Sequence, residues 1–219
     1  MTAEKAVLFD LDGTLLDTAP EFAYCLNHLL QEEGKPPVVL AELREFVSFG
    51  AKGMVGFAFK LSEQDPAFND LKERFLALYY QNTGFQSQLF PGVSTLLQQI
   101  TDKEIPWGIV TNKQQVYTTR LIEKFKPLQA ALCVVAGDTL SVNKPDPAPL
   151  LHACKTLKVK PENCWYIGDA KTDVEASKSA KMPCGVAQYG YIPRHEDAKH
   201  WQADYYLEKI SDIEHFLFA

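Results

Sequence analysis

The chain has 219 residues, 46% of them hydrophobic and 23% charged, which is typical of a globular protein and argues against a disordered one. Its net charge of -6 and pI near 5.4 argue against broad binding to nucleic acids or anionic membranes, which needs clustered Lys and Arg. No apolar run approaches the ~20 residues of a membrane span, and the first residues show no signal-peptide pattern, so we expect a cytoplasmic protein.

The first predicted strand covers residues 6–9 and runs into an acidic turn, Asp10-Leu11-Asp12-Gly13-Thr14. Side chains alternate along a strand, so Asp10 and Asp12 face the same side if the strand geometry continues that far. Both could then reach one substrate atom, one as a nucleophile and the other as a proton shuttle. An ordinary strand end explains the same residues equally well, because Asp and Gly are common turn formers. The rest of the chain must therefore decide.

Residues 18–89 carry helical patterns, around Phe22 and Leu26 and again around Phe68 and Leu71, and no convincing strand. We predict a core domain from residues 1–17 and 90–219, and an inserted all-helical cap domain from residues 18–89. An insertion at the carboxyl end of the first strand would cover a site there and act as a lid. A second domain packed elsewhere is the alternative.

Strands and helices alternate through the rest of the chain. The apolar runs predict strands over 107–110, 132–136, 164–167 and 185–187, and apolar residues recur at helical spacing between them. This alternation predicts an α/β fold, a Rossmann-like, doubly wound parallel sheet with helices on both faces. In such sheets, ligands bind outside the carboxyl ends of the strands.

Polar groups follow each of the next three predicted strands at the end where a ligand would bind. They are Thr111, Asn112 and Lys113 after the second strand, Lys144 after the third, and Asp169 and Asp173 after the fourth. Each has an ordinary explanation as a helix cap, a helix-start acid or a solvated lysine. Their occurrence in order, each behind a strand, favours one shared site.

These groups suit phosphoryl transfer through an aspartyl-phosphate. An aspartate such as Asp10 is ionised at neutral pH and can attack phosphorus. Mg²⁺ commonly takes one or two carboxylates, which Asp10 and Asp169 could supply. Lys144 would neutralise the transferring group and Thr111 would donate a hydrogen bond to it. Asp12 would protonate the leaving oxygen and then take a proton from the attacking water.

Four segments resemble the ordered motifs of the haloacid dehalogenase superfamily, in its branch with a helical cap after the first motif: FDLDGTLLDT, VTNK, NKPDPAPL and YIGDAKTDVEAS. The resemblance covers the whole chain and implies Asp10 as nucleophile and Asp12 as general acid/base. The phosphate-binding residues that it implies are Thr111, Asn112 and Lys144. The Mg²⁺ ligands that it implies are Asp10, Asp169, the second metal acid Asp173 and the backbone carbonyl of Asp12. Ala170 departs from the family pattern, where a hydroxyl or an acid is common.

The second aspartate separates reactions within this superfamily. The dehalogenases lack it, so Asp12 favours the phosphatase or phosphomutase branches. A sugar phosphomutase would use the same core but retain a phosphorylated sugar intermediate. A non-catalytic phosphometabolite-binding protein would be expected to have lost one of the acids or Lys144, and none is lost. We therefore predict a phosphatase, with these two as the alternatives.

The predicted cap carries the clue to the substrate. The segment 48–53 resembles the specificity loop of phosphoglycolate phosphatases, and Lys52 or Arg44 could meet a substrate carboxylate. A solvated helix-start lysine is the other interpretation of Lys52. Together with the segments 188–192 and 200–204, this loop resembles N-acetylmuramic acid 6-phosphate phosphatases. We place that sugar phosphate ahead of 2-phosphoglycolate as the substrate, and expect a monomer or homodimer with no nucleic-acid or membrane partner.

The five cysteines are odd in number, widely spaced and without a C-x-x-C motif, so neither a disulfide framework nor a zinc site is predicted. We expect them to be reduced. Cys133, Cys154 and Cys164 lie in apolar runs and should pack as small hydrophobic residues.

Overall fold

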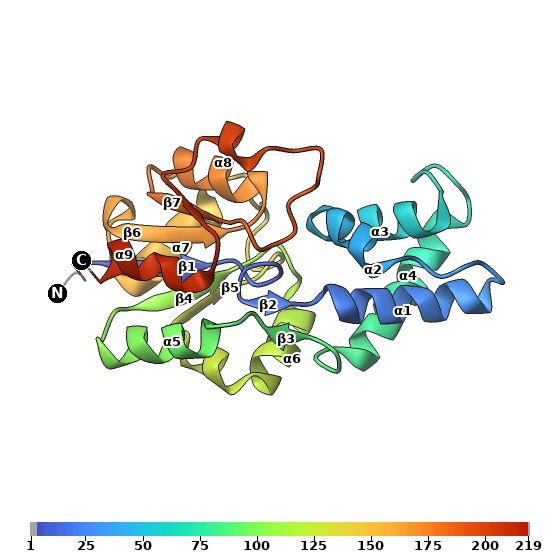
Figure 1. The fold of residues 1–219 in the computed structure, drawn as a ribbon, viewed down its shortest axis with the longest axis horizontal. Helices are drawn as coiled ribbons and strands as arrows, with labels where there is room; N and C mark the ends of the chain where they lie inside the picture. The colour runs from blue at the N-terminus through green and yellow to red at the C-terminus, as the bar shows by residue number, and fades with distance from the viewer. Residues whose placement is uncertain (1–3, 219) are drawn as a thin grey trace.

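The computed structural model describes residues 4–218, and within them the strands form a six-stranded sheet in the order β5-β4-β1-β6-β7-β8 (Figure 1). Every neighbouring pair is parallel. The strands are β1 (Ala6–Phe9), β4 (Trp107–Val110), β5 (Cys133–Val135), β6 (Cys164–Gly168), β7 (Cys184–Ala187) and β8 (Tyr205–Leu207). The predicted α/β fold is confirmed. The strand β8 was not predicted, because three residues at a sheet edge show no measurable alternation.

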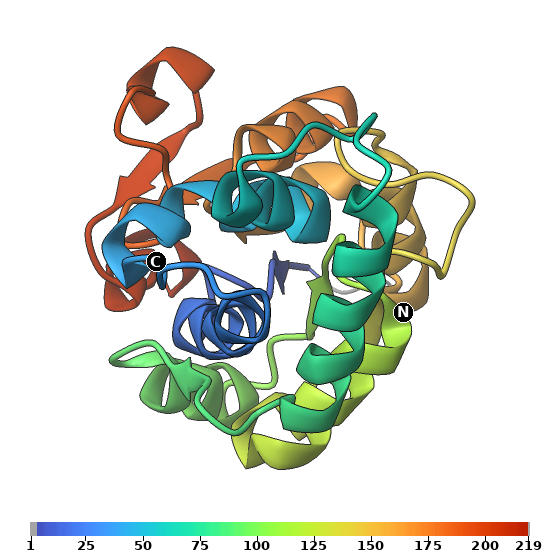
Figure 2. The ribbon, with the colours of Figure 1, turned by 90° about the vertical axis from the view of Figure 1, so that its right-hand side faces the viewer.

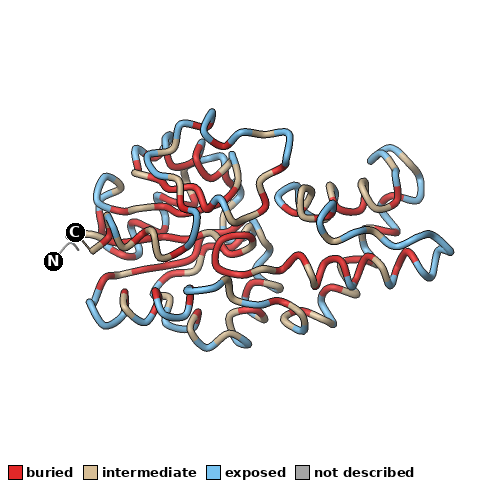
Figure 3. Tube along the Cα trace, in the orientation of Figure 1, coloured by how far each residue is buried: buried red, intermediate tan, exposed pale blue. Residues whose placement is uncertain are grey.

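The strand β1 explains why helices cover both faces of this sheet. All of its residues are buried, with Val7 and Phe9 in one hydrophobic cluster and Ala6 and Leu8 in another, as side-chain alternation requires. Helices that contribute to the first cluster are α5 (Val93–Asp102), α6 (Gln115–Lys124) and α9 (Glu214–Leu217). Helices that contribute to the second are α7 (Ala148–Leu157) and α8 (Lys171–Ser179). Figure 3 shows the buried residues concentrated along the strands.

A separate group of helices lies beyond the carboxyl end of β1. These are α1 (Ala19–Glu32), α2 (Leu40–Leu43), α3 (Gly50–Phe59) and α4 (Phe68–Asn82), which we call the cap. The cap has its own hydrophobic cluster, to which α1 contributes Phe22 and Leu26 and α4 contributes Phe75 and Tyr79. In Figure 2, which looks at the molecule from the cap side, these helices stand in front of the sheet.

The two segments that join the cap to the sheet pair with each other. They form β2 (Leu16–Asp17) and β3 (Gln88–Leu89), an antiparallel ribbon in which Leu16 is opposite Leu89. The strand β3 lies in the stretch that was predicted to have none, because two residues are too few to show a periodicity. Next to this ribbon, the carboxylate of Glu21 at the start of α1 accepts a hydrogen bond from the backbone amide of Gln86, just before β3 (3.0 Å). Entry to the cap and exit from it are therefore adjacent.

The remaining short elements are 3-10 helices, η1 (Arg44–Phe49), η2 (Lys126–Ala130), η3 (Pro161–Asn163), η4 (Ala198–Trp201) and η5 (Ile210–Ile213). Across residues 4–218, no helix combines the length and the apolar character needed to cross a bilayer.

The strand order places β1 at a switch point. After the cap, the chain fills the sheet on one side of β1 with β4 and β5, and then on the other side with β6, β7 and β8. The loops that follow β4 and β6 therefore diverge around the end of β1, and such a divergence opens a crevice at the carboxyl ends of the strands.

Candidate active site

A cleft of about 650 Å³ lies at this crevice, between the sheet edge and the cap. Its lining includes most of the predicted site residues: Asp10, Asp12, Thr111, Asn112, Lys144, Asp169 and, from the cap, Lys52. Asp173 is 2% exposed and makes an ion pair with Lys144, which lines the cleft. The fold thus brings together side chains that are up to 163 positions apart in the chain.

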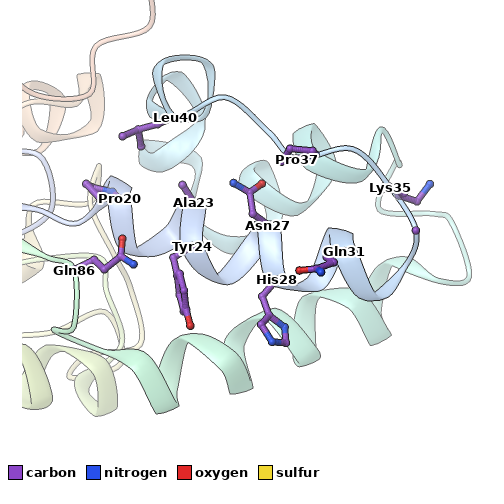
Figure 4. A pocket seen from close by; sticks show the side chains of 11 residues that line it. Pro20, Ala23, Tyr24, Asn27, His28, Gln31, Lys35, Pro37, Leu40 and Gln86 are labelled. Carbon is purple, nitrogen blue, oxygen red and sulfur yellow. The ribbon is translucent and has the colours of Figure 1, made fainter.

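A second hollow, of about 800 Å³, runs along α1 (Figure 4). Its lining includes Tyr24, Asn27, His28 and Lys35, and no carboxylate contributes to it. A site for phosphoryl transfer is recognised by convergent titratable groups and not by volume. The cleft at the sheet edge is therefore the candidate active site.

The turn that carries Asp10 and Asp12 is shaped by close packing. Strand β1 ends at Phe9, yet the Asp10 amide still donates to the carbonyl of Ile167 (2.8 Å). Gly13 has φ +82°, and a Cβ atom at this position would collide with the carboxylate of Asp169, so the turn requires glycine. Regular strand geometry stops before Asp12, but Asp10 and Asp12 both line the cleft, as the spacing predicted.

Lys144 is buried among acceptors, with only 2% of its side chain exposed. Its Nζ atom lies 3.2 Å from Asp10 Oδ2 and 2.7 Å from Asp173 Oδ1. It also donates to the Tyr166 hydroxyl (2.6 Å) and to the Val110 carbonyl (3.1 Å). Burial opposes the charged form, but the carboxylates of Asp10 and Asp173 outweigh it and raise the pKa of Lys144. The solvated-lysine interpretation is therefore wrong: Lys144 is a fixed ammonium beside Asp10.

Thr111 and Asn112 come from the end of β4, and their side chains differ in availability. Asn112 donates to the carbonyl of Lys144 (2.9 Å) and accepts from its amide (3.1 Å), so this side chain joins two loops. The Thr111 oxygen accepts from the Lys113 amide (3.2 Å), and within residues 4–218 its hydroxyl proton has no acceptor. Thr111 can therefore donate into the cleft, whereas the Asn112 side chain is already engaged.

Three carboxylates converge at one point. One oxygen each from Asp10, Asp169 and Asp173 lie within 4.8 Å of one another. Asp169 accepts from the Thr14 hydroxyl (3.0 Å) and, at its other oxygen, from the backbone amide of Tyr191 (2.7 Å). Burial, followed by the charges of Asp10 and Asp173, raises the pKa of Asp169 well above its ordinary value. Burial raises the pKa of Asp10 to about 6, although Lys144 opposes this shift.

The charge balance suits a divalent cation. The site holds four carboxylates and two ammonium groups, namely Asp10, Asp12, Asp169, Asp173, Lys113 and Lys144. Two negative charges remain when all are ionised, and hard oxygen ligands are those that Mg²⁺ prefers. Both oxygens of Asp173 already accept hydrogen bonds, from Lys144 and from the Ala170 amide (2.9 Å). Direct ligation of a metal by Asp173 stays a prediction.

Mg²⁺ is expected to raise the melting temperature much more at about pH 7.5 than at about pH 5, because a metal binds deprotonated ligands. The pKa of Asp10 is raised from 3.8 to about 6 in the folded chain. Its contribution to the free energy of unfolding is therefore complete below about pH 3.8 and is lost as the pH rises through about 6. A cation bound to the ionised Asp10 would restore this stability, and about 1 kcal/mol corresponds to roughly 2–4 °C in a chain of this size. Thermal melts with and without Mg²⁺ at matched ionic strength measure the effect; equal shifts at both pH values would contradict it.

The two cap cations proposed for a substrate carboxylate occupy different places. Lys52 lines the cleft, where its Nζ atom pairs with Glu63 (2.6 Å) while 59% of its side chain stays exposed. Such a surface pair is worth little, so Lys52 can exchange Glu63 for a ligand. Arg44 instead pairs with Asp17 (2.6 Å) and lies over the ring of Tyr191, which lines the cleft, but Arg44 itself is not among the lining residues.

Two further residues connect the site to the linkers of the cap. Lys113 reaches Asp12, with 3.0 Å between Nζ and Oδ2. The Tyr191 hydroxyl accepts from the amides of Thr18 (2.7 Å) and Ala19 (2.9 Å), while its own backbone amide holds Asp169. The position of Lys113 behind β4 predicted its place in the site but not its contact with Asp12, and nothing in the sequence placed Tyr191 in the site, since the partners of both residues are distant in the chain.

The comparisons with known proteins identify the class to which this chain belongs. Residues 7–187 match the haloacid dehalogenase-like hydrolases, so the chain is a member of that family, as the motifs indicated. The relatives of 36–40% identity described below are named phosphatases, and the chain is a phosphatase. It is 40% identical over 210 residues to the phosphoglycolate phosphatase of Xanthomonas campestris pv. campestris (strain 8004), covering 95% of this chain and 94% of the relative.

Two more relatives extend this result. The chain is 36% identical over 209 residues to the N-acetylmuramic acid 6-phosphate phosphatase of Pseudomonas aeruginosa, covering 95% of this chain and 92% of the relative. A crystal structure described as a predicted phosphoglycolate phosphatase from Haemophilus somnus 129PT has a TM-score of 0.85 and 26% identity, with 97% of both chains covered. Relatives with two different named substrates are thus similar to this chain over almost its whole length.

Proposed function

We propose that this phosphatase is a Mg²⁺-dependent phosphomonoester hydrolase that works through an aspartyl-phosphate. One observation carries the proposal: Asp10 and Asp12 face the same cleft, with the buried ammonium of Lys144 3.2 Å from Asp10. This arrangement supplies a nucleophile, a proton carrier and a positive charge for the transferring group. Mg²⁺ held by Asp10 and Asp169, with the carbonyl of Asp12, would neutralise phosphate charge.

The reaction takes place in two steps. An oxygen of Asp10 attacks phosphorus, the bond from phosphorus to the ester oxygen breaks, and that oxygen takes a proton from Asp12. A water then attacks the phosphorus of the aspartyl-phosphate, gives its proton to Asp12 and releases inorganic phosphate and free Asp10. Thr111 donates to a phosphate oxygen, and Lys144 compensates the charge that moves between Asp10 and phosphorus.

For the substrate we propose N-acetylmuramic acid 6-phosphate, whose sugar ring and lactyl carboxylate suit the cap side of the cleft. That side is lined by Phe49, Met54 and Phe75, and it also carries Lys52. A cleft of about 650 Å³ can hold a substituted sugar, whereas a two-carbon acid has no body to pack against these side chains. The similarity to the Pseudomonas aeruginosa relative supports this proposal.

The second candidate substrate is 2-phosphoglycolate, and the similarity to the Xanthomonas campestris relative favours it. It has a carboxylate for Lys52 but no ring.

We also propose that the protein is cytoplasmic. Its five cysteines, all free and buried, support this location, because a reducing compartment keeps thiols from forming disulfides.

Phosphate release from three esters in the presence of Mg²⁺ tests the substrate. We expect the highest kcat/KM for N-acetylmuramic acid 6-phosphate, a lower value for N-acetylglucosamine 6-phosphate, which lacks the carboxylate, and the lowest for 2-phosphoglycolate. A preference for 2-phosphoglycolate would replace the first candidate by the second. Lack of Mg²⁺-dependent phosphate release from all three would contradict the proposed substrate class.

Lys52→Ala is expected to raise KM for N-acetylmuramic acid 6-phosphate by roughly 5- to 30-fold, the loss of one charge-assisted contact. The KM for N-acetylglucosamine 6-phosphate should change much less, because this ester has no carboxylate for Lys52 to meet. Lys155→Ala, an exposed lysine on α7, is the matched control. Equal changes on both sugars would show that Lys52 does not recognise the carboxylate.

A further inference from the structure

Lys113 lines the cleft, yet its side chain is almost completely shielded from solvent. It follows β4, and only 6% of its side chain is exposed. Its Nζ atom is 3.0 Å from Asp12 Oδ2, an ion pair at hydrogen-bond distance. The proposed mechanism gives Lys113 no role, yet it contacts the residue that carries the proton.

Aromatic rings of the cap hold the Lys113 ammonium from the other side. Its Nζ atom is 4.7 Å from the centre of the Phe22 ring and 4.8 Å from the centre of the Tyr79 ring. Phe22 belongs to α1 and Tyr79 to α4, so both rings belong to the cap, whereas Lys113 belongs to the core. An ammonium within about 6 Å of a ring centre is attracted to the face of that ring. The position of Lys113 therefore depends on the cap.

Asp12 is held by two donors that come from different parts of the chain. Lys113 contacts Oδ2, and the hydroxyl of Thr18, on the linker into the cap, donates to Oδ1 (2.5 Å). One hydrogen bond leaves a carboxylate free to turn about its own side-chain bonds, whereas two donors on different oxygens fix its plane. Proton transfer to a leaving oxygen depends on that orientation.

We propose that Lys113 is a positioning residue for proton transfer by Asp12. It orients the Asp12 carboxylate toward the leaving oxygen, and the rings of Phe22 and Tyr79 hold Lys113 in the position that does so. The orientation of Asp12 is complete only while the cap covers the core. This inference rests on the proposed function, since it concerns the proton step of that reaction.

Two aryl esters of almost the same size separate this role from substrate binding. Phenyl phosphate has a poor leaving group that needs a proton from Asp12, whereas 4-nitrophenyl phosphate has a good one that needs it much less. In Lys113→Met we expect kcat/KM to fall roughly 30-fold for phenyl phosphate and only about 3-fold for the nitrophenyl ester, because loss of orientation removes part of the ~10²- to 10⁴-fold that general acid catalysis contributes. Lys113→Arg, which keeps a cation that stacks on rings, should recover part of this difference.

Lys103→Met is the matched control, because Lys103 also lies over a ring, that of Phe218 (5.0 Å), without lining the cleft. It should leave the ratio of the two esters unchanged. Tyr79→Leu removes one of the two rings and should shift the ratio in the direction of Lys113→Met; an unchanged ratio would overturn the dependence on the cap.

Equal losses on the two esters in Lys113→Met would overturn the positioning role and assign Lys113 to binding or to folding. If Lys113→Met does not fold, the ratio measured in Lys113→Arg and Lys113→Gln decides in its place, with Gln expected to resemble Met. A wild-type chain that hydrolyses neither ester with Mg²⁺ would instead contradict the proposed function itself. The two failures are therefore distinct.

Discussion

Asp10→Asn is expected to abolish the Mg²⁺-dependent release of phosphate from 4-nitrophenyl phosphate, with kcat lower by at least about 10³-fold. An amide oxygen is a poor nucleophile, and a neutral side chain also loses its attraction to Lys144, which lies 3.2 Å from Asp10. Steady-state phosphate release measures the loss. Acid quenching of the wild-type enzyme during turnover should trap labelled phosphate on the protein, and the variant should trap none.

The stability of the Asp10→Asn variant shows whether its loss of activity comes from unfolding. Asparagine keeps the shape of Asp10 and an oxygen that can accept from the Leu11 amide (2.7 Å). Burial raises the pKa of Asp10, so the removal of its charge should stabilise the metal-free chain near neutral pH. An inactive variant that melts higher than the wild type without Mg²⁺ would agree with this account. Substantial retained turnover would rule out Asp10 as the nucleophile.

Lys144→Met is expected to damage activity and folding together. The variant leaves the carboxylates of Asp10 and Asp173 without their ammonium, and breaking a buried ion pair from one side costs about 3–5 kcal/mol. We expect that loss of unfolding free energy in urea, and a fall in kcat of at least about 10²-fold, because the transferring group loses a fixed positive charge.

The pH dependence of this destabilisation distinguishes it from a simple packing defect. Protonation of Asp10, whose pKa is raised to about 6, removes part of the uncompensated charge, so the loss should be smaller at about pH 5 than at about pH 7.5. Lys155→Met, on the exposed side of α7, is the control and should leave stability nearly unchanged. An equally stable Lys144→Met would show that the buried pair does not contribute to folding.

The sheet could be predicted because its signal is local. Each of the strands β1, β4, β5, β6 and β7 is a short apolar run ended by turn residues, and each was predicted to within one residue at either end. The alternation with helices then required a parallel sheet, and the parallel sheet required that the polar residues behind the strands meet at one edge. Order along the chain was therefore enough to gather Asp10, Thr111, Lys144 and Asp169.

The contacts across the site could not be predicted, because they depend on side-chain reach between distant segments. The motif around Lys144 implied a phosphate-binding residue, but nothing local shows that Lys144 is buried on two carboxylates or that Lys52 is exposed and paired with Glu63. Lys113 belongs to the VTNK motif, but the adjacent rings of Phe22 and Tyr79 that hold it come from the first and the last helix of the cap, which are far apart in the sequence. The strand β8 was missed because its three residues gain their place only by pairing with β7.

In the ribbon of β2 and β3, Asp17 lies opposite Gln88, so the segment that enters the cap and the segment that leaves it are paired side by side. Insertions are tolerated best where their ends are adjacent, since the host chain then continues almost as if it were uncut. We therefore expect the segment between Asp17 and Gln88 to be exchangeable for another helical module while the sheet and its acids stay in place. Such a chimera would keep the nucleophile and the metal acids of the core and acquire a different range of substrates, while its new module would have to supply rings that hold Lys113 as Phe22 and Tyr79 do. The joint therefore makes the nucleophilic step and the selectivity separately adjustable, whereas the proton step stays tied to the module.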